Sequence, residues 1–513
     1  MGYIQGVSRF QLSFGSLEDL ISMDNPVRFI DVFSDKLDLE KIGFSTKILQ
    51  KEGRPSFESS IFVRLYLYGY LNGIRSSRKL EKECKRNTEL QWLLQSLCPN
   101  YHSISDFRKD NPAALKKLFK LFVSFLKNAD LIAGETIAID GTKSRAHNSK
   151  KANFSQKKID RHLDYIETKV AAYMEVLEAC DAQEDAVKVT NVLDKIDTLK
   201  ARKIDYELLE KQLQESGEPQ ISTTDADARA LLVQGQVVEV SYNIQAAVDD
   251  KHNLVVATHT INRNDRNALA AIAKEVQENL EIENYTALVD KGYHNGNQIH
   301  QCTEAKITTI VAAPELVNSN EKGTTKAYMV TEFVYDKEAD TYTCPQGETL
   351  HTTGSWHKKT RERDSYQFKK YRTSKCKECP VRNLCTARAS GGREIDRSEY
   401  AEAVEANNQR YRENPELYRR RQEINEHIFG TIKRQWGYNH TNLTGLEKVN
   451  GEHSLIMLVY NIKRSMNILG VPTLIEKLHQ FKHPYMKDSL FLFFRAYFKL
   501  QCAPPFYLAK IAA

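Results

Sequence analysis

Two short apolar runs, each ending in an aspartate, constrain the fold of this chain more than any other feature. Residues 136–140 read TIAID, and residues 285–290 read YTALVD. Apolar, β-branched runs of this length are typical of buried strands. Adjacent strand ends can bring Asp140 and Asp290 together at one edge of a sheet. Taken alone, each run also fits a purely structural strand that ends in an ordinary turn, such as Asp140-Gly141.

The segments around these runs predict a mixed α/β (α+β) core. Residues 155–217 are charged and helical, and their heptads are too irregular for a long coiled coil, so we interpret them as an inserted helical hairpin. We expect strands at 240–248, 254–258 and 306–313, and helices at 267–280 and shortly after Asp290. Three consecutive strands followed by strand–helix alternation is the order of a ribonuclease-H-like sheet. Residues 131–314 are therefore predicted to form the first part of such a core.

The chain before this core is predicted to be a helical domain over residues 1–130. An apolar helix leads into a basic stretch at 75–86, and Ser103 with Asp106 predicts a capping box for a further helix. Helix, turn and helix with cationic ends suit a DNA-docking domain, in which Arg75, Arg78 and Lys79 would contact phosphates. The alternative is a solvated charged face on a helical bundle.

Residues 315–400 predict a second insertion, rich in β-structure. A β-hairpin is expected at 333–347. Aromatic and cationic residues then alternate over 356–372, which suits base stacking and phosphate contact by Lys358, Lys359, Lys369 and Lys370. An amphipathic strand with no ligand would show the same pattern.

Four of the nine cysteines lie in this second insertion: Cys344, Cys376, Cys379 and Cys385. The Cys376-x-x-Cys379 pair has the spacing of one half of a zinc site, whereas the other half is irregular. A structural Zn²⁺ is one interpretation. Four reduced thiols beneath a small sheet is the other.

Residues 401–470 are predicted to complete the core with helices, and 471–513 to form a C-terminal tail. At about 100° per residue, Arg419, Glu426 and Lys433 fall on one line of a helix over 418–436. The other side of that helix is apolar, with Ile424, Ile428, Phe429, Ile432 and Trp436. This pattern predicts a helix that packs on the sheet and presents a carboxylate between cations, although an exposed helix with an incidental glutamate is the alternative.

The three acids Asp140, Asp290 and Glu426 would repel one another unless cations lay between them. Oxygen ligands suit Mg²⁺ or Mn²⁺, and two such ions about 3.5–4 Å apart can clamp the attacking and leaving oxygens of an in-line phosphoryl transfer. Lys143 and Arg145, in the polar tail after Asp140, would suit a loop near phosphates. Arg419 and Lys433 would meet phosphate oxygens near the scissile bond.

Composition permits nucleic-acid binding without requiring it. The chain has 513 residues, a formal net charge of +6 and 27% charged residues, so two to four soluble domains are expected. The start, MGYIQGVSR, lacks a cationic segment followed by an apolar run, and no stretch has the length of a membrane span, so we expect neither a signal peptide nor a membrane anchor. Nine cysteines in so long a chain suit a reducing cytoplasm.

Several motifs together resemble the DDE transposases of bacterial insertion sequences. They are LYLYGYLNGIRSSRKL at 65–80, IDGTK at 139–143, YNIQAAVD at 242–249, VDKGY at 289–293 and NEHIFGTIK at 425–433. The similarity spans about residues 15–470 and is closest to the group with a Tyr-Arg-Glu-Lys signature, in a branch with a helical N-terminal domain and a cysteine-bearing insertion.

The resemblance implies a ribonuclease-H-like catalytic domain with Asp140, Asp290 and Glu426 as metal-binding acids and Lys433 as the lysine of the signature. The family's tyrosine and arginine should lie seven and four residues before the glutamate, where this chain has Arg419 and Gln422, while Tyr418 and Arg421 each stand one residue earlier. Arg421 is included among the expected DNA contacts.

The implied activity is metal-dependent nicking at transposon ends followed by strand transfer into target DNA. The implied partners are the terminal repeats, target DNA and further copies of the chain assembled on DNA, in the bacterial cytoplasm near the nucleoid. Three alternatives stay open: a nuclease of the same fold, a non-catalytic DNA-binding protein derived from a transposase, and a zinc-dependent regulator built around the cysteines.

Overall fold

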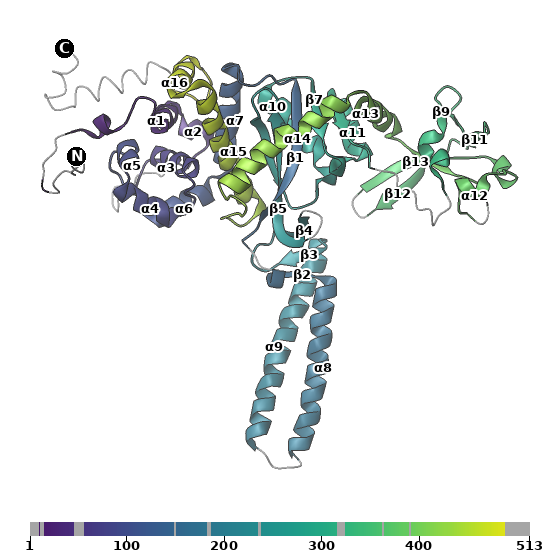
Figure 1. Cartoon of the computed structure of the whole chain (residues 1–513). Coiled ribbons are helices and arrows are strands. Elements are labelled where there is room, and N and C mark those ends of the chain that lie inside the picture. Colours follow the sequence, from purple (N-terminus) through teal and green to yellow (C-terminus); the bar gives the residue numbers. More distant parts are fainter. Residues whose placement is uncertain are drawn as a thin grey trace, which may run out of the picture.

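The computed structural model describes residue 10 and residues 15–45, 56–147, 150–181, 186–233, 237–314, 324–361, 364–388 and 391–487. A central mixed sheet lies between a helical N-terminal part and a small β-rich lobe, and a long helical hairpin projects from it (Figure 1). The prediction of a mixed helix-and-sheet chain is confirmed. The end of the predicted tail, beyond residue 487, lies outside the described residues. Within the described part of the chain, no helix has both the length and the apolar character that a membrane span needs.

Seven helices build the N-terminal part around a cluster of aromatic rings that includes Phe29, Phe33 and Phe122. The helix α6 begins at Tyr101, and Asn100 Oδ1 accepts a hydrogen bond from the Ser103 backbone N–H at 2.9 Å. The predicted capping box of Ser103 and Asp106 is therefore wrong, because the helix begins two residues before Ser103. The helices are α1 Pro26–Lys36, α2 Leu39–Ile42, α3 Ser59–Leu71, α4 Ser77–Arg86, α5 Thr88–Leu93, α6 Tyr101–Asp110 and α7 Pro112–Asn128.

The central sheet has the strand order β6-β5-β1-β7-β8, and β4 pairs with the first part of β5. The strand β1 runs antiparallel to β5 and parallel to β7, and β7 runs parallel to β8. The helices α10 (Leu269–Leu280) and α11 (Gly296–Glu304) connect the later strands. The strands are β1 Thr136–Arg145, β4 Arg229–Val233, β5 Val237–Asp249, β6 Leu254–Ile261, β7 Tyr285–Val289 and β8 Ile307–Val311.

The strand β1 continues past Asp140, where the sequence predicted a turn and a polar loop. Residues 140–145 pair in register with β5, from Asp140 opposite Ala246 to Arg145 opposite Ser241. Gly141 is required here for close packing, because a Cβ at this position would lie closer than 3.0 Å to the carboxylate of Asp265 and the amide of Gln245. Lys143 and Arg145 thus project from a strand.

The strand β5 is buried from Val240 to Asp249, on both of its faces. Helices cover the sheet: α10 contacts β5 and β6, α15 (Leu446–Leu469) contacts β6, and α14 (Pro415–Phe429) contacts β1, β5 and β7. The alternating polar residues of β5, Asn243 and Gln245 among them, are fully buried. Buried polar side chains need hydrogen-bond partners, and those of β5 find them at the site described below.

Two insertions leave this core. The first is a hairpin of α8 (Gln156–Asp181) and α9 (Ala186–Ser216), closed at its base by β2 (Asn153–Ser155) and β3 (Gln220–Ser222). The second is a lobe whose sheet has the order β12-β13-β11-β10-β9, with β14 paired to β13. The predicted β-hairpin is present as β9 and β10. The strands of the lobe are β9 Val334–Asp336, β10 Thr341–Thr343, β11 Thr349–Thr352, β12 His357–Arg361, β13 Asp364–Arg372 and β14 Ile395–Ser398.

The chain returns from the lobe through α13 (Ala401–Glu413) into α14, and then into a π-helix over Gly430–Gln435. Of the predicted apolar side of α14 and its extension, Ile424, Ile428 and Ile432 are buried. The helices α15 and α16 (Val471–Gln480) follow and pack against the N-terminal helices, α15 on α7 and α3 and α16 on α1.

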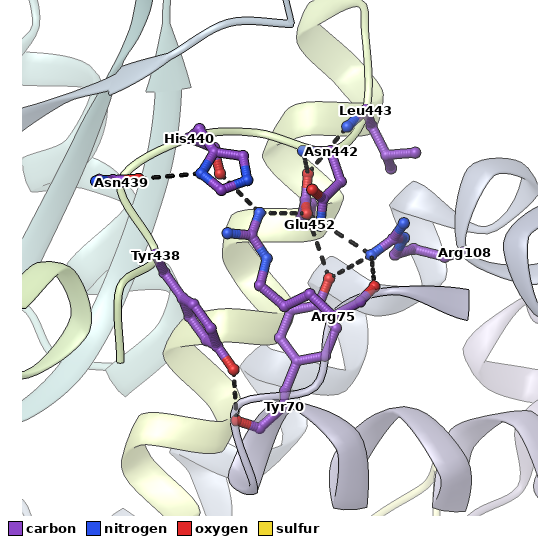
Figure 2. A network of polar contacts seen from close by, with 9 residues as sticks. All are labelled: Tyr70, Arg75, Arg108, Tyr438, Asn439, His440, Asn442, Leu443 and Glu452. Carbon is purple, nitrogen blue, oxygen red and sulfur yellow. Dashed lines mark hydrogen bonds and ion pairs between the residues drawn. The ribbon is translucent and has the colours of Figure 1, made fainter. Parts of the chain in front are cut away.

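A buried ionic network joins the N-terminal helices to the segment that follows α14 in the sequence (Figure 2). Glu452 of α15 is fully buried and accepts hydrogen bonds from Arg75 Nη2 at 2.8 Å and from the backbone N–H groups of Asn442 and Leu443 at 2.9 and 3.2 Å. Arg108 Nη1 lies 3.7 Å from the same carboxylate and donates to Tyr70 Oη at 2.7 Å.

Burial alone would raise the pKa of Glu452, but Arg108 and Arg75 hold it down at about 2. The carboxylate is therefore charged at neutral pH and paired with two guanidinium groups. Removing one partner of such a buried ion pair strongly destabilises a fold, so the network fixes the N-terminal helices on the core.

Candidate active site beside the end of β7

The two aspartates that end the apolar runs lie side by side on adjacent strands. Ile139 and Val289 are paired in the parallel register of β1 and β7, and Asp140 and Asp290 are the residues that follow. Their side chains keep 30% and 41% of their surface exposed, so the pair is open to solvent. The sheet therefore delivers two accessible carboxylates to one place.

The guanidinium of Arg421, on α14, lies between these carboxylates. Its Nη1 is 3.5 Å from Asp140 Oδ2 and its Nη2 is 3.5 Å from Asp290 Oδ1. The guanidinium also lies against the ring of Tyr418, 5.5 Å from the ring centroid. Arg421 therefore lies beside both aspartates with Tyr418 against it, whereas Arg419 pairs with Glu416 and Gln422 with Glu426.

Burial raises the pKa of Asp140 to about 6, and the negative charges of Asp290 and Asp265 act in the same direction. The Gly141 backbone N–H, which donates to Asp140 Oδ1 at 2.7 Å, and Arg421 oppose this rise. A carboxyl group in such surroundings is stabilised by added positive charge. The site therefore favours a cation beside Asp140.

Asp265 is a third acid at this place, and the sequence analysis missed it. It lies in a single helical turn after β6 and accepts hydrogen bonds from Asn243 Nδ2 at 2.7 Å and Gln245 Nε2 at 2.9 Å. Lys143 Nζ lies 3.2 Å from its Oδ2. Although burial opposes ionisation, Lys143 and the two amides lower the pKa of Asp265.

The polar residues of β5 were the available signal for Asp265. Asn243 and Gln245 alternate with apolar residues in a strand that is covered on both faces, so they needed a buried partner. Gln245 has a further partner, because its Oε1 accepts a hydrogen bond from the Tyr293 hydroxyl. Asp265 is thus held by a set of buried polar contacts that runs from β5 to Tyr293.

Lys433 reaches β1 from the π-helix that extends α14. Its Nζ donates to Thr142 Oγ1 and to the Lys143 backbone carbonyl, both at 2.8 Å. Burial and the nearby ammonium group of Lys143 lower the pKa of Lys433. Lys433 therefore contacts the strand that contains Asp140, at positions two and three residues after that aspartate.

Glu426 and Arg419 are exposed on α14, and the predicted line through Arg419, Glu426 and Lys433 does not form at the site. Glu426 accepts a hydrogen bond from Gln422 Nε2 at 2.7 Å, and Arg419 pairs with Glu416. Glu426 stands five positions after Arg421, so it points about 140° around the helix axis from Arg421. Arg421 is the residue that meets the aspartates. The π-helix, beginning at Gly430, then changes the direction of Lys433.

Asn425, next to Glu426, is buried, and neither atom of its amide has a hydrogen-bond partner among the described residues. It stands one turn after Arg421 and so lies on the same side of α14. Over the described ranges, however, no group of three or more His, Cys, Asp or Glu side chains is arranged to hold a metal ion. Two carboxylates and an unpaired amide fit a divalent cation in chemical type, but the ligand set is incomplete as it stands.

The other predicted DNA contacts lie in different settings. Arg75 is buried in the Glu452 network, so its guanidinium is not on the surface. Arg78 and Lys79 are exposed on α4, and Arg145 is exposed and paired with Glu239.

In the lobe, Lys358 is exposed and Lys359 is half-buried, whereas Lys369 pairs with Asp340 and Lys370 with Glu394. The four predicted zinc ligands, Cys344, Cys376, Cys379 and Cys385, line one cavity in the lobe.

Two family models match the chain. Residues 343–466 match a model described as a transposase DDE domain, and residues 15–110 match one described as a transposase domain (DUF772). The first segment contains Glu426 and Lys433, and the second contains most of the N-terminal helices. Asp140 and Asp290 lie outside both segments. The searches of curated proteins and of solved structures each gave no match. The two family matches support a DDE transposase, that is, an insertion-sequence transposase.

Proposed function

We propose that this protein cleaves DNA at the ends of an insertion sequence and joins them to target DNA by metal-dependent in-line phosphoryl transfer. The observation that carries the proposal is that Asp140, within β1, and Asp290, directly after β7, lie side by side on adjacent parallel strands with a single guanidinium between them. The strand order β6-β5-β1-β7-β8, with three antiparallel strands followed by two parallel ones, supports a ribonuclease-H-like core.

Asp140 and Asp290 would hold Mg²⁺ or Mn²⁺, because they lie side by side on adjacent strands. Glu426 is proposed as the third acid from the resemblance to DDE transposases, because its exposed side chain is turned away from the two aspartates. The chemistry that such ions supply is activation of the attacking oxygen and stabilisation of the leaving oxygen. Because Arg421 occupies the space between the aspartates, the proposal includes its withdrawal when metal and DNA bind. Lys433 holds the end of α14 on β1 and offers a positive charge to a phosphate beside Asp140.

DNA is proposed to contact the exposed cations of two regions, Arg78 and Lys79 on α4 and Lys358 in the lobe. The domain limits given above, membership of the Tyr-Arg-Glu-Lys group, assembly of several copies on paired ends and a cytoplasmic, nucleoid-associated location are further parts of the proposal. They are supported by the motifs and by the two family matches.

The test is cleavage of a labelled duplex that carries the terminal repeats flanking the gene, with Mg²⁺ or with chelator, and with a target plasmid to detect joining. We expect metal-dependent nicking at the repeat end and joined products. Asp290→Asn and Glu426→Gln should each abolish both, while Glu423→Gln, an exposed neighbour on α14, should leave them unchanged.

Three outcomes would separate the alternatives. Nicking without joined products would identify a nuclease of the same fold. Binding of the repeats without cleavage in any metal would identify a DNA-binding protein without catalysis. Full activity of Glu426→Gln together with loss in Asp290→Asn would remove Glu426 from the proposed set and keep the two aspartates.

A further inference from the structure

The β-rich lobe has one feature that the proposed DNA chemistry does not use, a cavity walled by four thiols. Cys344 follows β10, Cys376 lies in a helical turn over Ser374–Lys377, and Cys385 ends α12 (Arg382–Cys385). These three and Cys379 line the same cavity, are half-buried and form no disulfide. Segments up to 41 positions apart in sequence therefore converge on one small space.

Tight backbone turns present these cysteines. After Cys344, the Gly347 N–H donates to the Cys344 carbonyl at 2.8 Å, and Gly347 has a φ of +82°. On the other side, the Arg382 N–H donates to the Cys379 carbonyl at 3.2 Å. Gly392 allows the chain to pass close to Cys376, since a Cβ there would lie closer than 3.0 Å to the Cβ of Cys376. The backbone thus places the four cysteines on the wall of one cavity.

The apolar core of the lobe is small. In the described part of the lobe, the cluster of buried apolar residues consists of Phe333, Tyr342, Leu350, Tyr371 and Ile395, with Cys344 and Cys385 packed against them. Small units with so few buried apolar side chains usually need a disulfide or a metal to be stable. Because these cysteines are free and form no disulfide, a bound metal is the element that would stabilise the lobe.

The charge at the cavity also suits a metal–thiolate centre. Four thiolates around Zn²⁺ carry a net charge of about −2. The guanidinium of Arg393 lines the same cavity, and its buried Nε has no hydrogen-bond partner in the described part of the chain. An N–H donor beside the sulfur atoms would stabilise their negative charge.

We propose that Cys344, Cys376, Cys379 and Cys385 bind a single Zn²⁺ in a closed tetrahedral site that stabilises the lobe. On binding, each thiol releases its proton to solvent and the four sulfur atoms move inward from the cavity wall, where the side chains do not yet form a ligand set. All four positions are filled by protein ligands, so the centre is structural and has no open position for a substrate. This inference does not rest on the proposed DNA chemistry.

The experiment measures metal by mass spectrometry in the full chain, purified under reducing conditions without chelator. We expect about one zinc per chain in the wild type, in Asp290→Asn and in Cys98→Ser, a half-buried cysteine outside the lobe. The double variant Cys376→Ser/Cys379→Ser should have lost its zinc, and protease should cut it within residues 324–400. Retention of zinc by this double variant, or a metal-free wild type, would overturn the proposal.

A second measurement uses only the wild-type chain, in case the double variant does not fold. Zinc is removed with chelator, and Co²⁺ is added to the metal-free protein. Tetrahedral thiolate ligation gives an intense sulfur-to-cobalt charge-transfer band and visible bands, and Zn²⁺ should abolish both when it displaces Co²⁺. A spectrum typical of octahedral oxygen ligation would contradict the cysteine site, because it would place the ion at carboxylates.

Discussion

Gly141 shows how closely the acids are packed at the level of single residues. A Cβ at this position would lie closer than 3.0 Å to the carboxylate of Asp265 and to the amide of Gln245, so a larger residue would have to displace one of them. We expect Gly141→Ala to lower the free energy of unfolding by about 1–3 kcal/mol, as overpacking commonly does. DNA cleavage should fall more than stability alone explains, because Asp140 is the adjacent residue.

Denaturant unfolding and the cleavage assay, run side by side, would check this. Gly430→Ala is the matched control, because a Cβ at Gly430 has no atom within 4 Å and its backbone is helical. If the two variants have equal stability and equal cleavage activity, the close packing of Asp265 beside Gly141 matters for neither property.

Arg421 makes a second prediction at this scale. Since its guanidinium pairs with both aspartates, a metal ion entering the site has to compete with it. We expect Arg421→Gln to tighten binding of Mn²⁺ to the DNA-free protein by about tenfold, equivalent to roughly 1.4 kcal/mol. Titration of Mn²⁺ followed by electron paramagnetic resonance measures this directly. Arg419→Gln, which removes an exposed cation from the same helix, should change nothing, and weaker binding in Arg421→Gln would sink the idea.

At the level of elements, the sequence indicated that Asp140 and Asp290 lie on adjacent strands, because each follows a short apolar, β-branched run and that pattern is local. The continuation of β1 to Arg145 was not predictable in the same way. Asp140-Gly141 is a common turn pair, and only the neighbouring strand β5 shows that the backbone goes on in register. Asp265 was hidden for a similar reason, since its partners Asn243 and Gln245 come from a strand that is distant in sequence.

The helix α14 was predicted as an amphipathic helix, and three isoleucines of its apolar side are buried, while Phe429 and Trp436 are half-buried. The side that meets the aspartates was placed incorrectly. A uniform turn of about 100° per residue puts Arg419, Glu426 and Lys433 in line. The structure instead presents Arg421 to the aspartates and changes to a π-helix at Gly430. Such a change depends on packing, which local sequence does not encode.

Lys433 tests whether this π-helix matters. Its Nζ makes two hydrogen bonds to β1, so Lys433→Ala should lower the free energy of unfolding by about 1–2 kcal/mol and strongly reduce cleavage. Arg434→Ala removes the adjacent cation, which is exposed, and should affect stability by less than about 0.5 kcal/mol. Denaturant unfolding and single-turnover cleavage of both variants give the comparison. If Arg434→Ala loses more cleavage activity than Lys433→Ala, the role proposed for Lys433 is wrong.

At the level of the whole molecule, the Glu452 network couples stability to pH. The pKa of Glu452 is held at about 2 in the folded protein, below its ordinary value of 4.5. A lowered carboxyl pKa stabilises the fold above pH 4.5, and this contribution disappears as the pH falls from about 4.5 to 2. Glu452→Gln leaves Arg75 and Arg108 buried without a counter-ion and should cost about 3–5 kcal/mol at pH 7.

Urea unfolding of wild type and variant between pH 7 and pH 3 tests this. The difference between them should shrink as the pH falls below about 4.5. Comparing the two chains cancels most of the contribution of the neighbouring buried His453, which both contain. Glu447→Gln, on the exposed side of α15, should match the wild type at every pH. A constant difference across the range would mean that Glu452 acts by shape and not by charge.

The same network sets the order in which the chain can be completed during synthesis. Tyr70 and Glu452 are hydrogen-bonded to each other, yet 382 positions separate them. A ribosome that has already delivered the N-terminal helices must continue to residue 452 before Arg75 and Arg108 meet their carboxylate. Contacts this distant form late, because the loop between them has to close first. The first helices made are therefore the last to be locked, and the growing chain presents their unpaired arginines until α15 closes over them.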